Sequence, residues 1–388
     1  MESKKPERRH DVDWLRVLAT FSIVFFHVMR FFDLDPWAVK NNATSEIVMP
    51  FIGFFVQWMM PIFFVISGAA IYFALGFRNP RQFIKARITR IIIPLITVGV
   101  FVLVPPQEYI QAITYKNIPR GFSKISFYTQ YVKNIKLFIG EFPFLYLPVQ
   151  HLWYLEYLFL FSLILLPLFI YLRKNTGMVS KLAGLTDRGW TIYLFALPVW
   201  LLMSILNPET PLGNVYWFGG WPLLAYPIFL ILGFILFTDK RYEAAIEQQT
   251  KSAIKLAIIS LIVALIAWMK YGEGGLQYGT LGYPVFMMLR AFNSWFFIIV
   301  FLGLGRKHLS YTSPFLRYFS EASLPIYMLH QTVIVVIGFF IQDWQIGILP
   351  KFIFLLIATC IGIMGIYEVL IRRINASRFL FGLKAKKG

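Results

Sequence analysis

Residues 14–32 read WLRVLATFSIVFFHVMRFF, an apolar run long enough to cross a bilayer as one helix. Other runs of similar apolarity follow near 51–76, 89–108, 151–172, 190–206, 221–238, 253–270, 281–304, 323–341 and 350–371. Runs of this length indicate helices, because lipid leaves backbone groups to find their hydrogen bonds within the chain. The sequence therefore predicts an all-α polytopic membrane protein, a bundle of about ten transmembrane helices.

The composition agrees with a chain that folds in lipid. Of its 388 residues, 58% are hydrophobic and 14% are charged, and its mean hydropathy is positive. Soluble domains carry about 25% charged residues. No internal repeat divides the chain, so we expect one membrane domain over residues 1–388, with short basic tails at 1–12 and 374–388 and a long outer loop at 109–150. The later half of that loop, 127–148, suits either an interfacial or re-entrant helix or a packed cover over the bundle.

Lys and Arg side chains concentrate in alternate connections, and this bias sets an orientation. The connections assigned to the inside hold, among others, Arg8, Arg9, Arg81, Lys85, Arg173, Lys174, Lys240, Arg241, Arg306 and Lys307. The positive-inside rule then predicts that both termini are cytoplasmic. The net charge of +18 (37 basic minus 19 acidic residues) follows from this bias and from attraction to anionic membrane lipid, so we expect no nucleic-acid partner.

Ionisable side chains interrupt the first span on one face. Asp13 and Arg16 are three residues apart and can pair on a helix. Arg16 and His27 are eleven residues apart, close to whole helical turns, so both project to the same side and His27 lies ~16 Å deeper. An ionisable residue inside a span costs ~2.5–3.5 kcal/mol and usually marks a site. The alternative is an interfacial ion pair and a buried, hydrogen-bonded histidine; the shared face favours a functional set.

The second and third expected spans carry further candidates. Ser67 and Gly68 interrupt an aromatic run, which allows either close helix packing or a donor group facing a cavity. Arg87 and Arg90 share a helical face where the third span is expected to start, and a helix N-terminus with two guanidinium groups suits a phosphate. Anchoring by the positive-inside rule explains the same arginines equally well.

Polar and aromatic side chains gather near the outer ends of the fourth and ninth expected spans: His151, Trp153, Tyr154, Glu156, Tyr327 and His330. Such combinations are typical of sites for carbohydrate, although an aromatic belt at the lipid interface also explains Trp153 and Tyr154. Arg290 lies well inside the eighth span. We expect it to face a cavity or a carboxylate partner, because an unpaired arginine is costly there.

Five short motifs together resemble the membrane acyltransferase type 3 family. In chain order they are Arg16 with His27 after ten intervening residues, Phe63–Gly68, Arg87–Arg90, His151–Leu155 and Ala322–His330. They are similar to the family's arginine-ten-histidine, FFVISG-like, arginine-x-x-arginine, HLW-F/Y-L and S-x-x-IY-x-x-H motifs. The resemblance covers residues 9 to about 375 and keeps the family's order.

The resemblance implies transfer of a succinyl or acetyl group from cytoplasmic acyl-CoA to a hydroxyl of a carbohydrate, at the outer face of the cell inner (cytoplasmic) membrane. Acyl-CoA would be a donor substrate, with no permanently bound cofactor and no metal.

The roles that this activity implies follow the motifs. The donor side would comprise Arg87, Arg90, Ser67 and Gly68, and the catalytic set Asp13, Arg16 and His27. His151, Trp153, Tyr154, Glu156, Arg290, Tyr327 and His330 would form the acceptor side. His27 could act as a general base or accept the acyl group itself. Two rival functions remain. The first is a secondary transporter or exporter, although the chain lacks the paired broken segments typical of that class. The second is a non-catalytic membrane scaffold or receptor, which would leave the aligned cation and histidine on one helix face unexplained.

Overall fold

The structure, a computed structural model, describes residues 8–135, 149–211, 213–214, 218–271 and 277–386. Every regular element within these ranges is a helix. Seven helical spans are long and apolar enough to cross a membrane: His10–Arg30, Glu46–Leu75, Pro80–Thr114, Lys240–Tyr271, Gly282–His308, Pro314–Ile341 and Ile348–Ile371. The all-α membrane architecture expected from the sequence is thus confirmed.

The remaining expected spans are shorter or bent. Gln150–Ile164 and Leu166–Lys174 meet at a 52° bend, and counting this pair as one span gives up to eight spans. Two shorter apolar helices, Trp190–Ile205 and Ala225–Ile235, lie where the fifth and sixth spans are expected. The expected count of about ten is therefore approximate, because apolarity alone does not show whether a helix is long enough to cross a ~30 Å core.

The helices form two compact units, each made of three chain segments. The first unit comprises Met1–Ala19, Gly53–Ile84 and Leu160–Ser320, and the second comprises Thr20–Ile52, Lys85–Phe159 and Glu321–Gly388. The boundary falls inside continuous helices such as α1 (His10–Arg30) and α13 (Pro314–Ile341).

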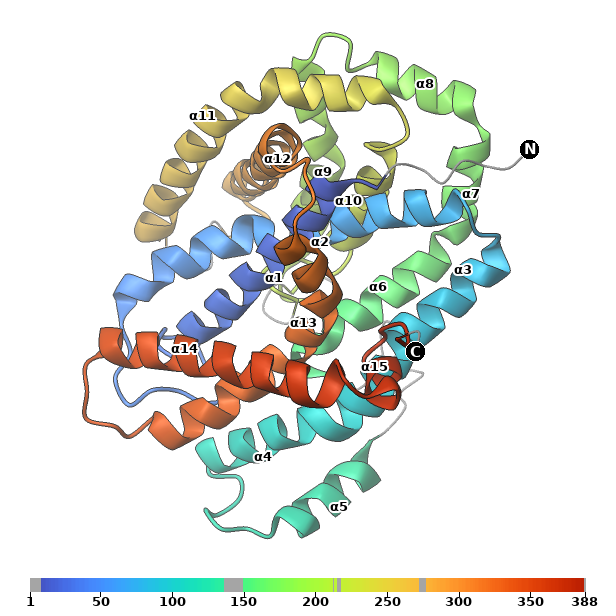
Figure 1. Ribbon diagram of the computed structural model, residues 1–388. Helices are drawn as coiled ribbons and strands as arrows, with labels where there is room; N and C mark the ends of the chain where they lie inside the picture. Colours follow the sequence, from blue (N-terminus) through green and yellow to red (C-terminus); the bar gives the residue numbers. More distant parts are fainter. Residues whose placement is uncertain (1–7, 136–148, 212, 215–217, 272–276, 387–388) are drawn as a thin grey trace. The chain divides into compact units, whose positions relative to one another are not determined.

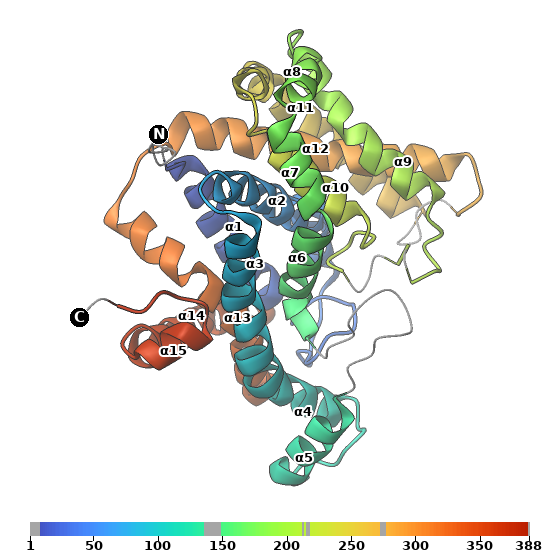
Figure 2. The same ribbon diagram turned by 90° about the vertical axis from the view of Figure 1, so that its right-hand side faces the viewer.

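Long helices of the first unit pack side by side. Figures 1 and 2 both show α11 (Lys240–Tyr271) along α12 (Gly282–His308), with α9 (Leu197–Ile205) beside α12. At the α11–α12 interface, the buried amide of Asn293 donates to Ala257 O (3.1 Å) and to Ser260 Oγ (2.7 Å). The same unit contains α7 (Leu166–Lys174) and α8 (Thr176–Gly184).

Two glycines bring α2 (Met49–Leu75) and α10 (Ala225–Ile235) into backbone contact in the first unit. A Cβ added at Gly68 would lie 2.2 Å from Leu230 O, and one added at Gly233 would lie 2.1 Å from Val65 O. Small residues allow such approach between membrane helices. The structure thus gives Gly68 a packing role. Its assignment to the donor site stays a prediction that this geometry does not support.

The second unit is built around an apolar cluster to which four helices contribute. Val28 of α1, Ile110 of α4 (Val104–Thr114), Ile334 of α13 and Leu355 of α14 (Ile348–Ile366) are all buried in it. The short helix α15 (Asn375–Leu380) follows α14 in the same unit.

The third span differs from the sequence prediction at its start. The helix begins at Pro80 as α3 (Pro80–Arg87) and continues through π-helical turns at Ile88–Ile92 and Leu95–Leu103 into α4. Arg87 and Arg90 therefore lie inside a continuous helix, and the expected phosphate seat at a helix N-terminus is wrong. The basic residues of α3 hid this start, because they lower the local apolarity from which the span was predicted.

The loop expected at 109–150 folds back as a helix as far as it is described. α5 (Lys124–Asn134) lies beside α4 in Figures 1 and 2. Tyr131 and Tyr128 of α5 donate hydrogen bonds to Val100 O (2.8 Å) and Phe101 O (3.1 Å). α5 has no buried residue, so both interpretations of this part of the loop, a packed cover and an interfacial helix, stay predictions. Residues 136–148 lie outside the described residues.

Candidate active site

Three histidines from distant parts of the sequence meet in the second unit. His27 of α1 and His330 of α13 place Nδ1 and Nε2 3.2 Å apart. His151 precedes α6 (Trp153–Ile164), and its ring centroid lies 4.9 Å from that of His330. The sequence assigned His27 to catalysis and His151 and His330 to an acceptor side. The structure joins all three in what we call the histidine cluster.

The hydrogen bonds determine which nitrogen of His27 keeps a lone pair. We assign neutral rings, each with one N–H and one lone pair, because a buried imidazolium without a counter-ion is costly. Nδ1 of His330 lies 2.5 Å from Tyr327 O, which can only accept, so this nitrogen donates and Nε2 accepts. Nδ1 of His27, 2.9 Å from Ile23 O and 3.2 Å from that Nε2, must then carry the hydrogen. Nε2 of His27 is left as the basic nitrogen.

Local helix geometry explains this orientation. His27 bonds to the carbonyl four residues earlier on α1, and His330 to the carbonyl three residues earlier on α13. Side chains on a helix lean towards its N-terminus, so a histidine Nδ1 reaches the preceding turn readily. Each helix thereby fixes one nitrogen of its own histidine.

His151 is held by two contacts with α13. Its Nε2 lies 3.0 Å from Met328 O, so Nε2 donates and Nδ1 keeps the lone pair. That Nδ1 is buried with no hydrogen-bond partner among the described residues. Tyr327 donates from its hydroxyl to His151 O (2.5 Å) and stands 5.6 Å from the ring of Tyr154. Tyr154 is only 7% exposed, so it does not belong to an aromatic belt facing lipid.

A buried amide network that the sequence analysis missed adjoins His330. Gln107 of α4 donates to Thr332 Oγ1 (2.7 Å), and Gln331 donates to Gln107 Oε1 (3.0 Å). These bonds fix the rotation of α13 where it carries His330. The sequence did contain an indication: Gln107 and Gln331 each lie in an apolar span, where polar groups are costly unless they are paired.

The sequence analysis also missed Trp37. It follows α1, packs against the apolar cluster, and its ring lies 6.1 Å from the imidazole of His27. The hydroxyl of Tyr115 donates to Trp37 O (3.1 Å). An aromatic ring beside a basic nitrogen offers an apolar surface to a substrate.

Ion pairs hold the loop that carries Trp37. Asp33, fully buried, pairs with Arg30 (2.6 Å) and Lys40 (2.7 Å), and Arg30 also pairs with Asp35 (2.6 Å). Burial raises the pKa of the Asp33 carboxyl, and the two cations partly offset this effect. The loop is therefore tied to the end of α1 next to the histidine cluster.

Two other members of the predicted catalytic set lie on the part of α1 that belongs to the first unit. Asp13 and Arg16 form the expected ion pair at 3.2 Å, and Asp13 also accepts from Arg8 (2.7 Å). α1 is continuous from His10 to Arg30, so the predicted register between Arg16 and His27 holds.

Arg290, in the first unit, has different partners from those predicted. Its guanidinium donates to Gly220 O and lies 4.8 Å above the ring of Trp221. No carboxylate pairs with it among the described residues. Gly220 has φ +89°, a conformation that favours glycine, so the turn itself presents this carbonyl.

For the other predicted residues, the structure gives the burial of each side chain but assigns no function. In the second unit, Glu156 is buried, Trp153 and Arg87 are half-buried, and Arg90 is exposed. Ser67, on α2 of the first unit, is buried.

Together these features describe a helical membrane protein in which the half-buried His27 meets the buried His151 and His330, with a lone pair assigned to Nε2 of His27. The sequence profile of the family described as acyltransferase domain, of the acyltransferase 3 type, matches residues 9–368. The chain therefore belongs to the acyltransferase 3 family, and it is a membrane acyltransferase. It is similar to the proteins named glucans biosynthesis protein C of Salmonella schwarzengrund (strain CVM19633) and Salmonella typhi. Each is 25% identical over 396 residues, covering 99% of this chain and 97% of the relative. No solved structure gives a significant match.

Proposed function

We propose that the protein moves an acyl group, succinyl or acetyl, from cytoplasmic acyl-CoA to a hydroxyl of a carbohydrate at the outer face of the inner membrane. Its relatives are named for glucans, so a glucan is the carbohydrate that we propose. The observation that carries the proposal is the basic Nε2 of His27, set by the bond between His27 and His330. Acyl transfer to a hydroxyl needs a base, and the lone pair on this nitrogen supplies one. Transport of a molecule across the membrane needs no such base.

The proposed chemistry uses this lone pair in one of two ways. As a general base, Nε2 takes the hydroxyl proton while the oxygen attacks the thioester carbonyl; a C–O bond forms, the C–S bond breaks, and the coenzyme thiolate receives the proton. As a nucleophile, Nε2 first takes the acyl group, and the C–S bond breaks to release the thiolate. The hydroxyl oxygen then attacks the acyl-imidazolium, the C–N bond breaks to restore the lone pair of Nε2, and the hydroxyl proton passes to the thiolate. In both routes His330 accepts the Nδ1 hydrogen of His27 and stabilises positive charge on its ring.

The acceptor would lie against Trp37, which supplies the flat apolar face on which sugar rings commonly rest. The donor assignment to Arg87 and Arg90 and the role of Arg16 remain part of the proposal.

The test is acyl transfer by purified protein in which His27 is replaced. His27→Gln keeps hydrogen bonding and similar volume but has no basic nitrogen, so transfer should fall ~10²–10⁴-fold. His308→Gln is the matched control, because His308 is exposed and outside the cluster, and it should keep full activity. Substantial turnover by folded His27→Gln would remove His27 from the mechanism.

A second measurement separates the two routes. The protein is incubated with acyl-CoA without acceptor, and its intact mass is measured after rapid quenching. An adduct of one acyl group that is absent from His27→Gln indicates the nucleophile; an unmodified mass together with full activity indicates the general base.

A further inference from the structure

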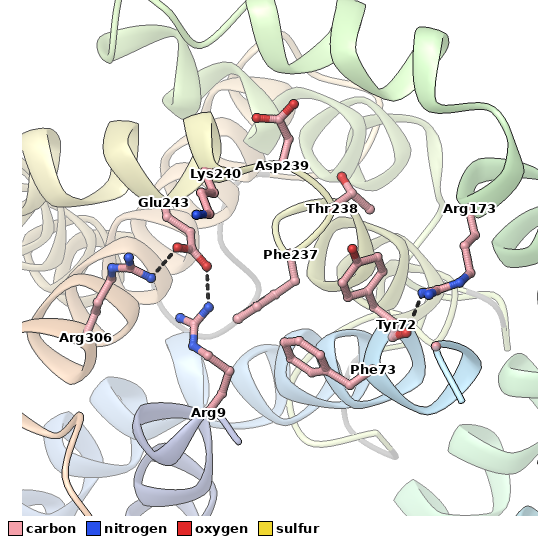
Figure 3. Close-up of a pocket in the computed structure, with 11 residues that line it drawn as sticks. Arg9, Tyr72, Phe73, Arg173, Phe237, Thr238, Asp239, Lys240, Glu243 and Arg306 are labelled. Carbon is pink, nitrogen blue, oxygen red and sulfur yellow. Dashed lines mark hydrogen bonds and ion pairs between the residues drawn. The ribbon is translucent and has the colours of Figure 1, made fainter. Parts of the chain in front are cut away.

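A pocket of about 520 Å³ lies in the first unit, and none of the residues that line it was assigned a role above. Figure 3 shows cationic side chains that four separate chain segments bring to it: Arg9, Arg173, Lys240 and Arg306. All four belong to connections that the positive-inside rule assigns to the cytoplasm. Anchoring at a lipid surface requires only that such residues be near headgroups. It does not require them to converge on one pocket.

The charges in this cationic pocket are only partly compensated. Glu243 accepts from both Arg9 and Arg306, as the dashed lines in Figure 3 show. Arg173 and Lys240 form no ion pair with any described residue, and Arg173 donates only to Tyr72 O (3.1 Å).

The pocket therefore keeps a positive charge. Its lining holds four cations and two carboxylates, Asp239 and Glu243. With the ion-pair partners Asp11, Glu247 and Arg241 included, five cations face four carboxylates, which leaves a net charge of +1 (five minus four). Asp239 is itself paired with Arg241 (2.9 Å) and accepts from its backbone N–H at the start of α11. Burial opposes the charge on Arg9, but hydrogen bonds from its guanidinium to Asp11 and Glu243 raise its pKa above the usual arginine value.

Aromatic side chains form the rest of the lining. The guanidinium of Arg9 lies 5.0 Å above the ring of Phe237, and that of Arg173 lies 5.2 Å above the ring of Tyr72. Phe73 packs edge-on against Phe237 with ring centroids 5.6 Å apart. Stacking holds the planar guanidinium groups in place and leaves their edges for bidentate bonds to an oxyanion. The pocket thus suits a ligand that combines phosphate with a planar or apolar part.

We propose that the cationic pocket binds a phosphate ester, with anionic oxygens at Arg173 on one side and at Lys240 on the other, and with its remaining part against the aromatic side chains that Figure 3 shows between them. Glu243 acts as an internal anion that holds Arg9 and Arg306 when no ligand is bound. Two sources have this chemistry: the nucleotide end of a coenzyme A donor and the headgroup of an anionic phospholipid. The nucleotide source rests on the proposed function, whereas the phosphate chemistry does not.

Binding is tested with two probes on purified full-length protein. Adenosine 3′,5′-bisphosphate, which carries no acyl group, is titrated calorimetrically into protein in neutral detergent. The lipid arm uses phosphatidylcholine nanodiscs with and without phosphatidylglycerol, and bound lipid is measured by native mass spectrometry. Arg173→Gln with Lys240→Gln should weaken binding of the effective probe by about tenfold or more, because two charge-assisted contacts are lost. Lys174→Gln with Lys251→Gln changes the net charge equally at exposed positions outside the pocket and should bind normally.

Glu243→Gln should change the affinity for the probe in the opposite direction. Removing the internal anion takes one carboxylate from Arg9 and Arg306, which keep Asp11 and Glu247 as partners, and raises the net charge of the pocket by one, so affinity for the probe should rise. An unchanged or lower affinity overturns the role of Glu243. If nucleotide binding depends on Arg173 and Lys240, the pocket binds the nucleotide end of the donor. If phosphatidylglycerol binding depends on these two residues, the pocket binds a lipid headgroup.

If folded Arg173→Gln with Lys240→Gln binds both probes like its matched control, the site is refuted. Because neither probe undergoes transfer, that result is distinct from a failure of the proposed function, which is read from turnover by His27→Gln.

Discussion

In the histidine cluster the polar groups are uncharged, and their partners are backbone carbonyls and one another. The cationic pocket instead holds formal charges on side chains that are half-buried or exposed, and carboxylates compensate only part of them. Neutral hydrogen bonds in a buried site depend on geometry and little on ionic strength, whereas exposed charges are screened by salt. The comparison separates a region suited to proton transfer from a region suited to holding an anion.

The largest expected effect concerns the side of the membrane on which each region opens. If the basic connections are cytoplasmic, a cytoplasm-active reporter fused after Gln82 or after Gly388 is fully active. An insertion near Gly213 reports the outer side only. Activity of a periplasmic reporter at the C-terminus would overturn the proposed orientation and remove the assignment of the cationic pocket to the cytoplasm.

Next in size is the loss of the hydrogen-bond partner of His27. His330→Leu removes one of the two acceptors of its Nδ1 hydrogen and leaves Ile23 O as the other. A neutral hydrogen bond is worth about 0.5–1.5 kcal/mol, so kcat should fall by up to roughly tenfold. His330→Gln restores an acceptor oxygen and should recover most of that loss, with KM for the donor unchanged in both variants. Equal losses in the two variants would mean that His330 does more than position His27.

A smaller effect is expected at Trp37, which tests whether the acceptor meets the histidine cluster. Trp37→Ala should raise KM for the carbohydrate by roughly two- to tenfold, because an aromatic contact contributes about 0.5–1.5 kcal/mol. Trp37→Phe keeps a ring and should retain most of the affinity. A fall in kcat with unchanged KM would instead place Trp37 in the support of His27.

The smallest expected effect is a dependence on salt, which should differ between the cationic pocket and the histidine cluster. Raising ionic strength from about 0.1 M to about 1 M shortens the screening length from ~10 Å to ~3 Å, so donor affinity should fall a few-fold. The rate of a single turnover at saturating donor should not change, because the histidine cluster is uncharged. A salt-dependent single-turnover rate would contradict the neutral assignment of the rings.

Most of the fold could be predicted from the sequence because lipid imposes a simple rule on the backbone. A run such as 14–32 must satisfy its own hydrogen bonds, so it forms a helix whatever its neighbours are. The same rule does not predict at which residue a helix begins or ends. The helix that starts at Pro80 passes through basic residues before its apolar part, and the helix at Ala225–Ile235 is shorter than the apolar run that contains it.

The site could be predicted only where its residues share a helix. The pair Asp13–Arg16 and the register from Arg16 to His27 follow from 3.6 residues per turn, and both hold. Gly68 was open between two roles, because only the position of Leu230 shows that a helix backbone occupies the space beside it.

The sequence by itself determined the helical membrane architecture, the family motifs and the identity of the polar residues that lipid should exclude. Only the tertiary structure decided that His27 and His330 share a hydrogen bond, that Trp37 lies beside them, and that Arg9, Arg173 and Arg306 line one pocket. The physical reason is that helix register is a local property of a few turns. A contact between residues some 300 positions apart depends instead on how several helices pack, and the sequence of either partner does not contain that information.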